Sequence, residues 1–94
     1  MKKMRKVTQL QKETEYGYKL VASFIQDTNE RGISTYCLRV TQEFEDSKVI
    51  GLPKIFTDFG NDKDYGNKVY KEYLKKGYTL FSTCEFEPTK MDMR

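Results

Sequence analysis

Residues 16–44 read YGYKLVASFIQDTNERGISTYCLRVTQEF, and this stretch decides the fold. From position 16 to position 24, apolar or aromatic side chains recur at every second residue, which is the period of a strand with one buried face. Residues 33–44 repeat this alternation. Turn-forming residues fill positions 27–32 between the two segments, and Gly32 tolerates the positive φ that a hairpin loop often needs. The stretch therefore predicts two strands joined by a hairpin.

Two further extended segments lie closer to the C-terminus. Residues 49–56 are largely apolar, but Gly51 and Pro53 interrupt them. Because proline cannot donate a hydrogen bond to a central ladder, we expect an edge strand, a bulged strand or two short pieces here. Residues 78–86 alternate again and end before Pro88, which predicts a final strand.

Between these segments, residues 62–76 have the spacing of an amphipathic helix. Asn61 is a suitable N-cap residue, and Gly77 suits the left-handed position after the last turn. At about 100° per residue the apolar side chains share one broad arc, which we expect to pack on the sheet. These side chains are Tyr65, Val69, Tyr70, Tyr73 and Leu74. Truncating Val69 or Leu74 to alanine is expected to cost roughly 1–4 kcal/mol.

The predicted order of elements is β-β-β-α-β. It corresponds to the α+β class, with a small antiparallel sheet and one amphipathic helix packed across one face. A length of 94 residues suits a single core. We assign residues 1–14 to a basic, weakly ordered arm, residues 15–87 to the domain and residues 88–94 to a loose tail.

The composition argues against catalysis. The chain has no histidine and two cysteines, Cys37 and Cys84, whereas acid–base catalysis and zinc binding usually depend on histidine. Cys37 lies two residues from Arg39, but a small, partly covered side chain explains it better than an activated thiol. The acidic residues at positions 58–64 lack the spacing of a calcium loop and suit helix capping. We expect a protein that is not an enzyme and has no metal and no cofactor.

The same features predict a cytoplasmic protein. Two distant thiols and no apolar leader favour a reduced compartment. No stretch approaches the run of about 20 apolar residues that spans a bilayer. We therefore expect no membrane insertion.

The formal charge of +3 is concentrated at the N-terminus. Lys2, Lys3, Arg5 and Lys6 belong to the 17 basic groups, which leaves residues 7–94 with 13 basic and 14 acidic groups. The outer arc of the predicted helix adds Lys68, Lys71 and Lys75. Together these side chains predict one of two functions, that of a small nucleic-acid-binding protein that contacts phosphates. It is the alternative to protein binding, which is the leading hypothesis. A solvated arm and a solvated helix face would account for the same charges.

The aromatic content supports the leading hypothesis for the function, which is binding to another protein. The chain has seven tyrosines and six phenylalanines, and tyrosine and arginine are common at the centres of protein interfaces. The expected partner contacts are Tyr16, Tyr18, Tyr36 and Arg39, although the three tyrosines are also in phase with the core positions of their strands. We therefore expect a non-enzymatic protein-binding module, regulatory or inhibitory, whose exposed sheet edge would also allow a homodimer.

Two resemblances bear on the origin of the chain. Residues 35–40 (TYCLRV), residues 55–58 (IFTD) and the helix with Val69 and Leu74 resemble small Gram-positive bacterial proteins that pair a tyrosine-containing hairpin with a short helix. That group has no established activity, so the resemblance implies a source and a fold class. In its size and its lack of motifs the chain is also similar to phage and mobile-element proteins that block host defence nucleases, such as anti-CRISPR proteins. This second likeness implies an inhibitor that occupies the surface of a partner protein.

Overall fold

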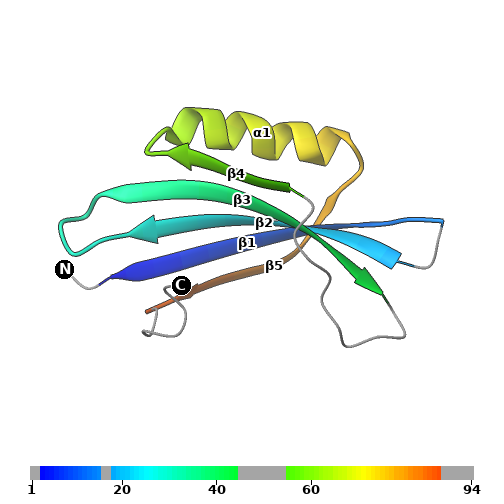
Figure 1. Cartoon of the computed structure of the whole chain (residues 1–94), viewed down its shortest axis with the longest axis horizontal. Helices are drawn as coiled ribbons and strands as arrows, with labels where there is room; N and C mark the ends of the chain where they lie inside the picture. The colour runs from blue at the N-terminus through cyan, green and yellow to red at the C-terminus, as the bar shows by residue number, and fades with distance from the viewer. Residues whose placement is uncertain (1–2, 16–17, 45–54, 88–94) are drawn as a thin grey trace.

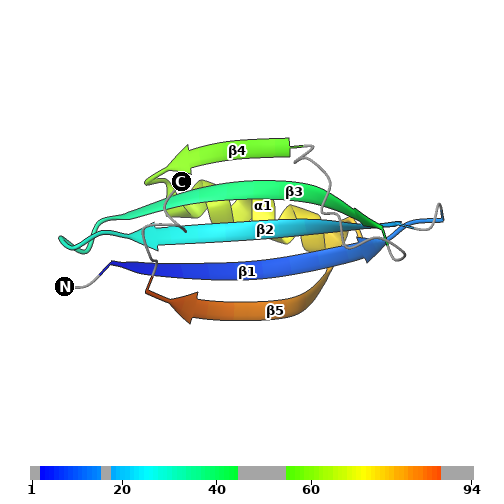
Figure 2. The ribbon, with the colours of Figure 1, turned by 60° about the horizontal axis from the view of Figure 1, so that its bottom comes forward.

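A computed structural model describes residues 3–15, 18–44 and 55–87 (Figure 1). These residues form one antiparallel sheet in the strand order β4-β3-β2-β1-β5, with a single helix on one face (Figure 2). Along the chain the elements are β1 (Met4–Glu13), β2 (Tyr18–Thr28), β3 (Ser34–Phe44), β4 (Ile55–Gly60), α1 (Lys63–Lys75) and β5 (Thr79–Phe86). The α+β class predicted from the sequence is confirmed, and the described order is β-β-β-β-α-β.

The additional strand is β1, which lies in the part of the chain expected to be a weakly ordered arm. β1 pairs with β2 on one side, from Met4 opposite Thr28 to Glu13 opposite Lys19, and with β5 on the other side. Both rows of its backbone groups are therefore used in the sheet. Leu10 in this strand is fully buried. The expectation for residues 4–13 was wrong because a strand paired on both sides keeps its place through backbone hydrogen bonds, even when few of its side chains are apolar.

The hairpin and the third segment largely follow the prediction. β2 and β3 pair along their whole length, and Gly32 in the loop has φ of 82°. β4 is an edge strand, as expected for the third segment, but it begins at Ile55 and continues to Gly60. Gly51 and Pro53 lie outside the described residues.

β4 contains an irregularity that serves the core. Asp58 pairs with Cys37 and Gly60 pairs with Tyr36, so Phe59 is an extra residue without a register partner. This is the geometry of a β-bulge, which re-aims a side chain. Phe59 is buried in the core cluster. The bulge therefore allows the end of the edge strand β4 to place a large aromatic side chain beneath the helix.

The helix begins and ends close to the predicted positions. Its N-cap is Asp62 rather than Asn61, because the Asp62 carboxylate accepts a hydrogen bond from the backbone N–H of Tyr65 at 3.0 Å. At the C-terminal end Gly77 has φ of 98°, the left-handed conformation expected there. The Lys12 ammonium group of β1 donates to the carbonyl oxygen of Lys76 at 2.8 Å, which connects this end of the helix to the sheet.

The helix face that packs on the sheet is narrower than the predicted arc. Gly66 and Tyr73 are buried, and Val69 and Tyr70 pack against the core. The side chain of Leu74 is 41% exposed, so its expected role in the core is not realised. The reason is geometric, since only residues near the centre of the arc touch a sheet that lies on one side of the helix.

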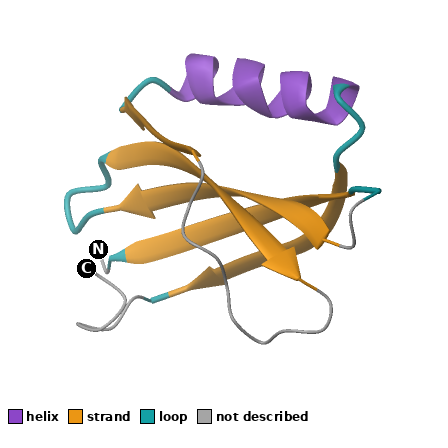
Figure 3. Ribbon diagram, turned by 45° about the vertical axis from the view of Figure 1, so that its right-hand side comes forward, coloured by secondary structure: helices purple, strands orange, loops and turns teal. Residues whose placement is uncertain are grey.

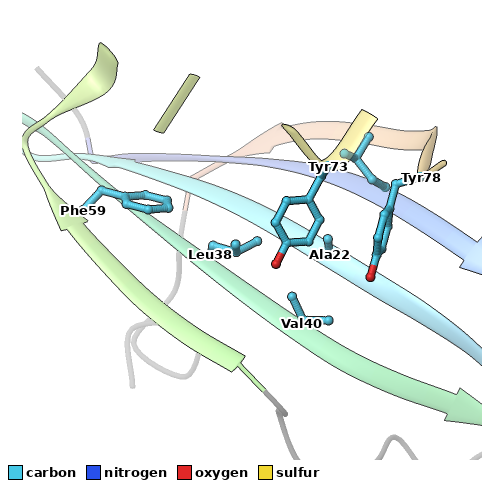
Figure 4. Packing of buried hydrophobic residues seen from close by; sticks show 7 residues of the cluster. Ala22, Leu38, Val40, Phe59, Tyr73 and Tyr78 are labelled. Carbon is cyan, nitrogen blue, oxygen red and sulfur yellow. The ribbon is translucent and has the colours of Figure 1, made fainter. Parts of the chain in front are cut away.

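The core lies between α1 and the centre of the sheet. Figure 4 shows Tyr73 and Tyr78 directed toward Ala22, Leu38 and Val40. The Tyr73 and Tyr78 rings are 5.0 Å apart between centroids, and the Phe24 ring meets Tyr73 edge to face at 5.7 Å. Burial raises the pKa of both tyrosine hydroxyls. Aromatic rings on aliphatic strand residues thus supply most of the packing.

The helix covers only part of the sheet. α1 packs over β3 and β4, and β5 lies at the opposite edge (Figure 3). At about 4.8 Å per strand the five strands span about 19 Å, whereas a helix with its side chains is about 10 Å wide. Leu10 of β1 is still buried in the core cluster. The part left without a covering helix is the helix-side face around Lys6 and Thr8 of β1 and Leu80 and Thr83 of β5, and we call it the open half-face.

Candidate functional site

The first feature of the surface is the free edge of β5, which pairs with β1 on one side and with no described strand on the other. Three large apolar side chains of this strand are exposed, with exposed fractions of 55% for Leu80, 44% for Phe81 and 36% for Phe86. Glu85 is the only charged residue in the strand. Edge strands that avoid pairing usually carry charges, proline or a cover. β5 therefore has the features of an edge that accepts a further strand.

The opposite edge, β4, is better protected. It has six residues against eight in β5, and α1 packs against one of its faces. A register irregularity occurs in both edge strands, at Phe59 in β4 and at Phe81 in β5, and so does not distinguish them. Phe56 of β4 is nevertheless exposed on the far side of the sheet. Because a short and partly covered edge is a poor template for pairing, β5 is the stronger interaction edge.

The second feature is a hollow of about 420 Å³ between the N-terminal half of α1 and the open half-face. Aromatic residues form part of its wall, and the rest combines polar residues with aliphatic ones, among them Leu80 of β5. The residues that matter for its chemistry are Lys6 and Thr8 from β1, Phe24 from β2, and Lys63, Asn67 and Tyr70 from α1. No carboxylate side chain is among the described residues that line it.

The far face of the sheet, opposite the helix, combines paired polar side chains with apolar ones, among them the buried Val21 and the exposed Phe56. Arg5 holds Asp27 in a bidentate ion pair, with its Nε 2.7 Å from Oδ1 and its Nη2 3.1 Å from Oδ2. Gln9 donates to the Ser23 hydroxyl at 3.1 Å. Arg39 is an exposed residue on this face. The pairing leaves the far face well satisfied within the chain.

The residues predicted as partner contacts do not share one surface. Tyr36 belongs to the helix side, where it packs against the core and borders the hollow. Tyr18 occupies the same face of β2 by strand alternation, opposite Phe44 in the register. Arg39 lies on the far face, and Tyr16 is outside the described residues. Tyr36 and Arg39 are an odd number of residues apart in one strand, which by itself indicates opposite faces.

The predicted basic residues are also divided. Arg5 is ion-paired on the far face, whereas Lys6 lies on the open half-face. Lys3 immediately precedes β1, and Lys2 is outside the described residues. The three helix lysines are all exposed on the outer side of α1, away from the sheet, at Lys68, Lys71 and Lys75. The structure thus gives no single basic face, and it brings Lys6 together with Lys63, a residue that the sequence analysis did not select.

The environment of Cys37 opposes activation. Burial is the main cause that raises the pKa of its thiol, and the nearby carboxylates of Asp27 and Asp58 act in the same direction. The positive charges of Arg39 and Arg5 lower it, but to a smaller extent. Because the thiolate is the reactive form, Cys37 is a weak nucleophile near neutral pH.

This difference predicts how the two free thiols react. Cys84 is exposed, whereas Cys37 is half-buried. With iodoacetamide near neutral pH we expect Cys84 to be alkylated about tenfold faster or more, since reaction needs an accessible thiolate. Peptide mass spectrometry over time measures both rates, and the C84S variant should lose the fast phase. Faster labelling of Cys37 would contradict the environment described above.

Within residues 3–15, 18–44 and 55–87, no group of three histidine, cysteine, aspartate or glutamate side chains is placed to hold a metal ion. The described helix is too short and too polar to cross a membrane.

The described residues define a small α+β fold in which the edge strand β5 has no described neighbour on its outer side and lies beside a half-covered sheet face. No protein-family model matches the chain, and neither the curated proteins nor the solved structures contain a match to it. The surface itself is therefore what indicates the function.

Proposed function

We propose that this chain is a non-enzymatic protein-binding module that recognises its partner by strand addition along β5. The observation that supports the proposal is the unpaired edge of β5 with Leu80, Phe81 and Phe86 exposed on it. In strand addition, backbone hydrogen bonds supply affinity and alternate side chains supply specificity. Full burial of an exposed Leu or Phe side chain contributes about 1.5–3 kcal/mol. Because Leu80, Phe81 and Phe86 are only partly exposed, a partner would gain a part of this free energy from each of them, in addition to the backbone hydrogen bonds of the edge.

A regulatory or inhibitory role follows from the same features. A module of this kind changes the activity of a partner by occupying the surface it contacts, as an inhibitor of a defence protein from a phage or mobile element would. Its two free cysteines suit the cytoplasm. The other occupant that β5 could accept is a second copy of the chain, because an edge strand also supports an isologous homodimer.

The test compares the two sheet edges. Phe81→Lys places a charge on the β5 edge, and the matched variant Phe56→Lys does the same on the β4 edge, where the side chain is 60% exposed. Each tagged protein is used to capture partners from a Gram-positive bacterial lysate, with and without nuclease. We expect F81K to lose the captured protein and F56K to retain it, while both variants melt close to the unmodified protein.

The other outcomes have distinct meanings. Equal capture by both variants would refute recognition through β5. Capture that disappears with nuclease or moderate salt would favour the nucleic-acid alternative, because phosphate contacts weaken steeply with ionic strength. A sedimentation experiment on the purified protein separates self-association, since a dimer through β5 should dissociate in F81K and persist in F56K.

A further inference from the structure

We infer that the hollow beneath α1 binds a small ligand with a flat apolar body and a negatively charged group. This site adjoins the partner surface proposed for β5, since Leu80 and Thr83 of that strand line it, but its ligand is a small molecule and not a strand. Its volume of about 420 Å³ lies within the range of about 300–1,000 Å³ that is common for small-molecule sites. The hollow exists because a single helix covers only part of the five-stranded sheet.

The apolar part of the site is built from aromatic rings. Phe24 and Tyr70 meet edge to face, with 5.3 Å between ring centroids and 80° between their planes. Two nearly perpendicular rings form an apolar corner, to which Tyr36 adds a third ring. A planar apolar body packs against such a corner by stacking on one ring and touching the edge of another.

Two lysine side chains give the charged part of the site a positive charge, one from the sheet and one from the helix. Lys6 comes from β1, and Lys63 is the first residue of α1, so their side chains reach the hollow from the sheet and from the helix. Neither ammonium group takes part in an ion pair among the described residues. An anionic group would therefore meet two lysines that have no competing partner within the described chain.

The nearest carboxylates do not cancel this charge. Glu85 is the cross-strand neighbour of Lys6 at the outer end of β5, but it does not line the hollow. Asp62 and Asp64 flank Lys63 in the sequence, and the Asp62 carboxylate is already used as the helix N-cap. The hydroxyl groups of Thr8 and Thr83 and the amide of Asn67 add neutral hydrogen-bonding groups. This set of groups selects an anion over a cation.

The experiment uses three probes with one ring system and three charges, namely indoleacetate, indole and tryptamine. Each is titrated into isotopically labelled protein, and the amide signals are followed by NMR. We expect indoleacetate to bind most tightly, with a dissociation constant in the millimolar range that suits so small a ligand. Its largest shifts should fall on Thr8, Asn67 and Thr83, which line the hollow.

Substitutions in the hollow then test the origin of the preference. Lys6→Gln and Lys63→Gln should each weaken indoleacetate about threefold, the size expected for an exposed charge pair, and should leave indole unchanged. Asn67→Asp puts a carboxylate into the hollow beside the two lysines and should reduce the preference for indoleacetate over tryptamine. Lys68→Gln, next to Asn67 but on the outer side of α1, is the matched control and should change nothing.

Other results would overturn the inference. Equal affinity for the three probes would show that the lysines do not select charge. Shifts centred on Phe81 and Phe86, which do not line the hollow, would assign the binding to the edge strand. Absence of shifts with all three probes would show that the hollow does not bind ligands of this class. None of these results alters the comparison of F81K with F56K, which tests the β5 edge alone.

Discussion

A variant that lacks residues 1–13 is expected to lose its fold. The deletion removes β1, which lies between β2 and β5, and it takes the fully buried Leu10 out of the core. β5 would then have no neighbouring strand in the sheet, and β2 would become an edge. Because small domains hold only about 5–15 kcal/mol of stability, loss of a central strand exceeds what the remainder can tolerate. Circular dichroism and the dispersion of amide NMR signals measure the result.

A second variant tests whether the positive charges of this segment, and not the strand itself, are needed for stability. K3Q/K6Q removes two positive charges but keeps β1, and its stability should lie within about 0.5 kcal/mol of the unmodified protein because both changes are at the surface. The truncated chain could instead show the full circular dichroism signal of a sheet and unfold cooperatively. Residues 1–14 would then be the dispensable arm that the sequence predicted.

The second large effect is expected for Leu38→Ala, which should destabilise the protein by about 2–5 kcal/mol. Leu38 is 2% exposed and lies in the middle of the core, beneath the aromatic side chains of the helix side (Figure 4). Removing its methyl groups costs transfer free energy and leaves a cavity, because the surrounding strands are held by their hydrogen bonds. Urea denaturation monitored by circular dichroism gives the free energy of unfolding.

Leu74→Ala is the matched comparison, since it removes the same atoms from a side chain that is 41% exposed. We expect it to cost less than about 1 kcal/mol, in line with a mostly solvated position. Similar costs for the two substitutions would mean that Leu74 packs as deeply as its helical spacing suggested, and that the helix face is as broad as predicted.

Most individual elements could be predicted because each carries its own local signal. β2 and β3 alternate with a period of two, and the helix has both a cap and a stop residue. Gly32 and Gly77 adopt the positive φ that their positions required. Signals of this kind depend on residues close in sequence, so they do not need the rest of the fold.

The sequence did not predict β1 because the alternation of apolar and polar residues that marks a strand is weak where a sheet face is not covered. On its helix side the strand presents Lys6, Thr8 and Lys12, with only Met4 and Leu10 as apolar residues. Alternation of apolar and polar residues appears only where one face is buried, and the helix packs over the other half of the sheet. The polar residues of β1 that weakened the strand pattern, Lys6 and Thr8, are also residues that line the hollow and can make polar contacts there.

The candidate site was even less accessible from the sequence. Lys6 and Lys63 are far apart along the chain, and they share one hollow only because the chain crosses from the β4 edge to the β5 edge through α1. The exposure of Leu80 and Phe81 likewise depends on β5 being an edge, whereas the same residues in a central strand would be read as core.

By itself the sequence determined the fold class, the hairpin, the helix and the final strand, because hydrophobic period and turn residues act over a few positions. Only the tertiary structure decided that β1 is central, that β5 is a free edge and that one helix leaves half of a sheet face open. Those features depend on the order in which strands pair, and pairing is set by backbone hydrogen bonds between segments distant in sequence. The functional surfaces of this protein lie where that order leaves backbone and side chains uncovered.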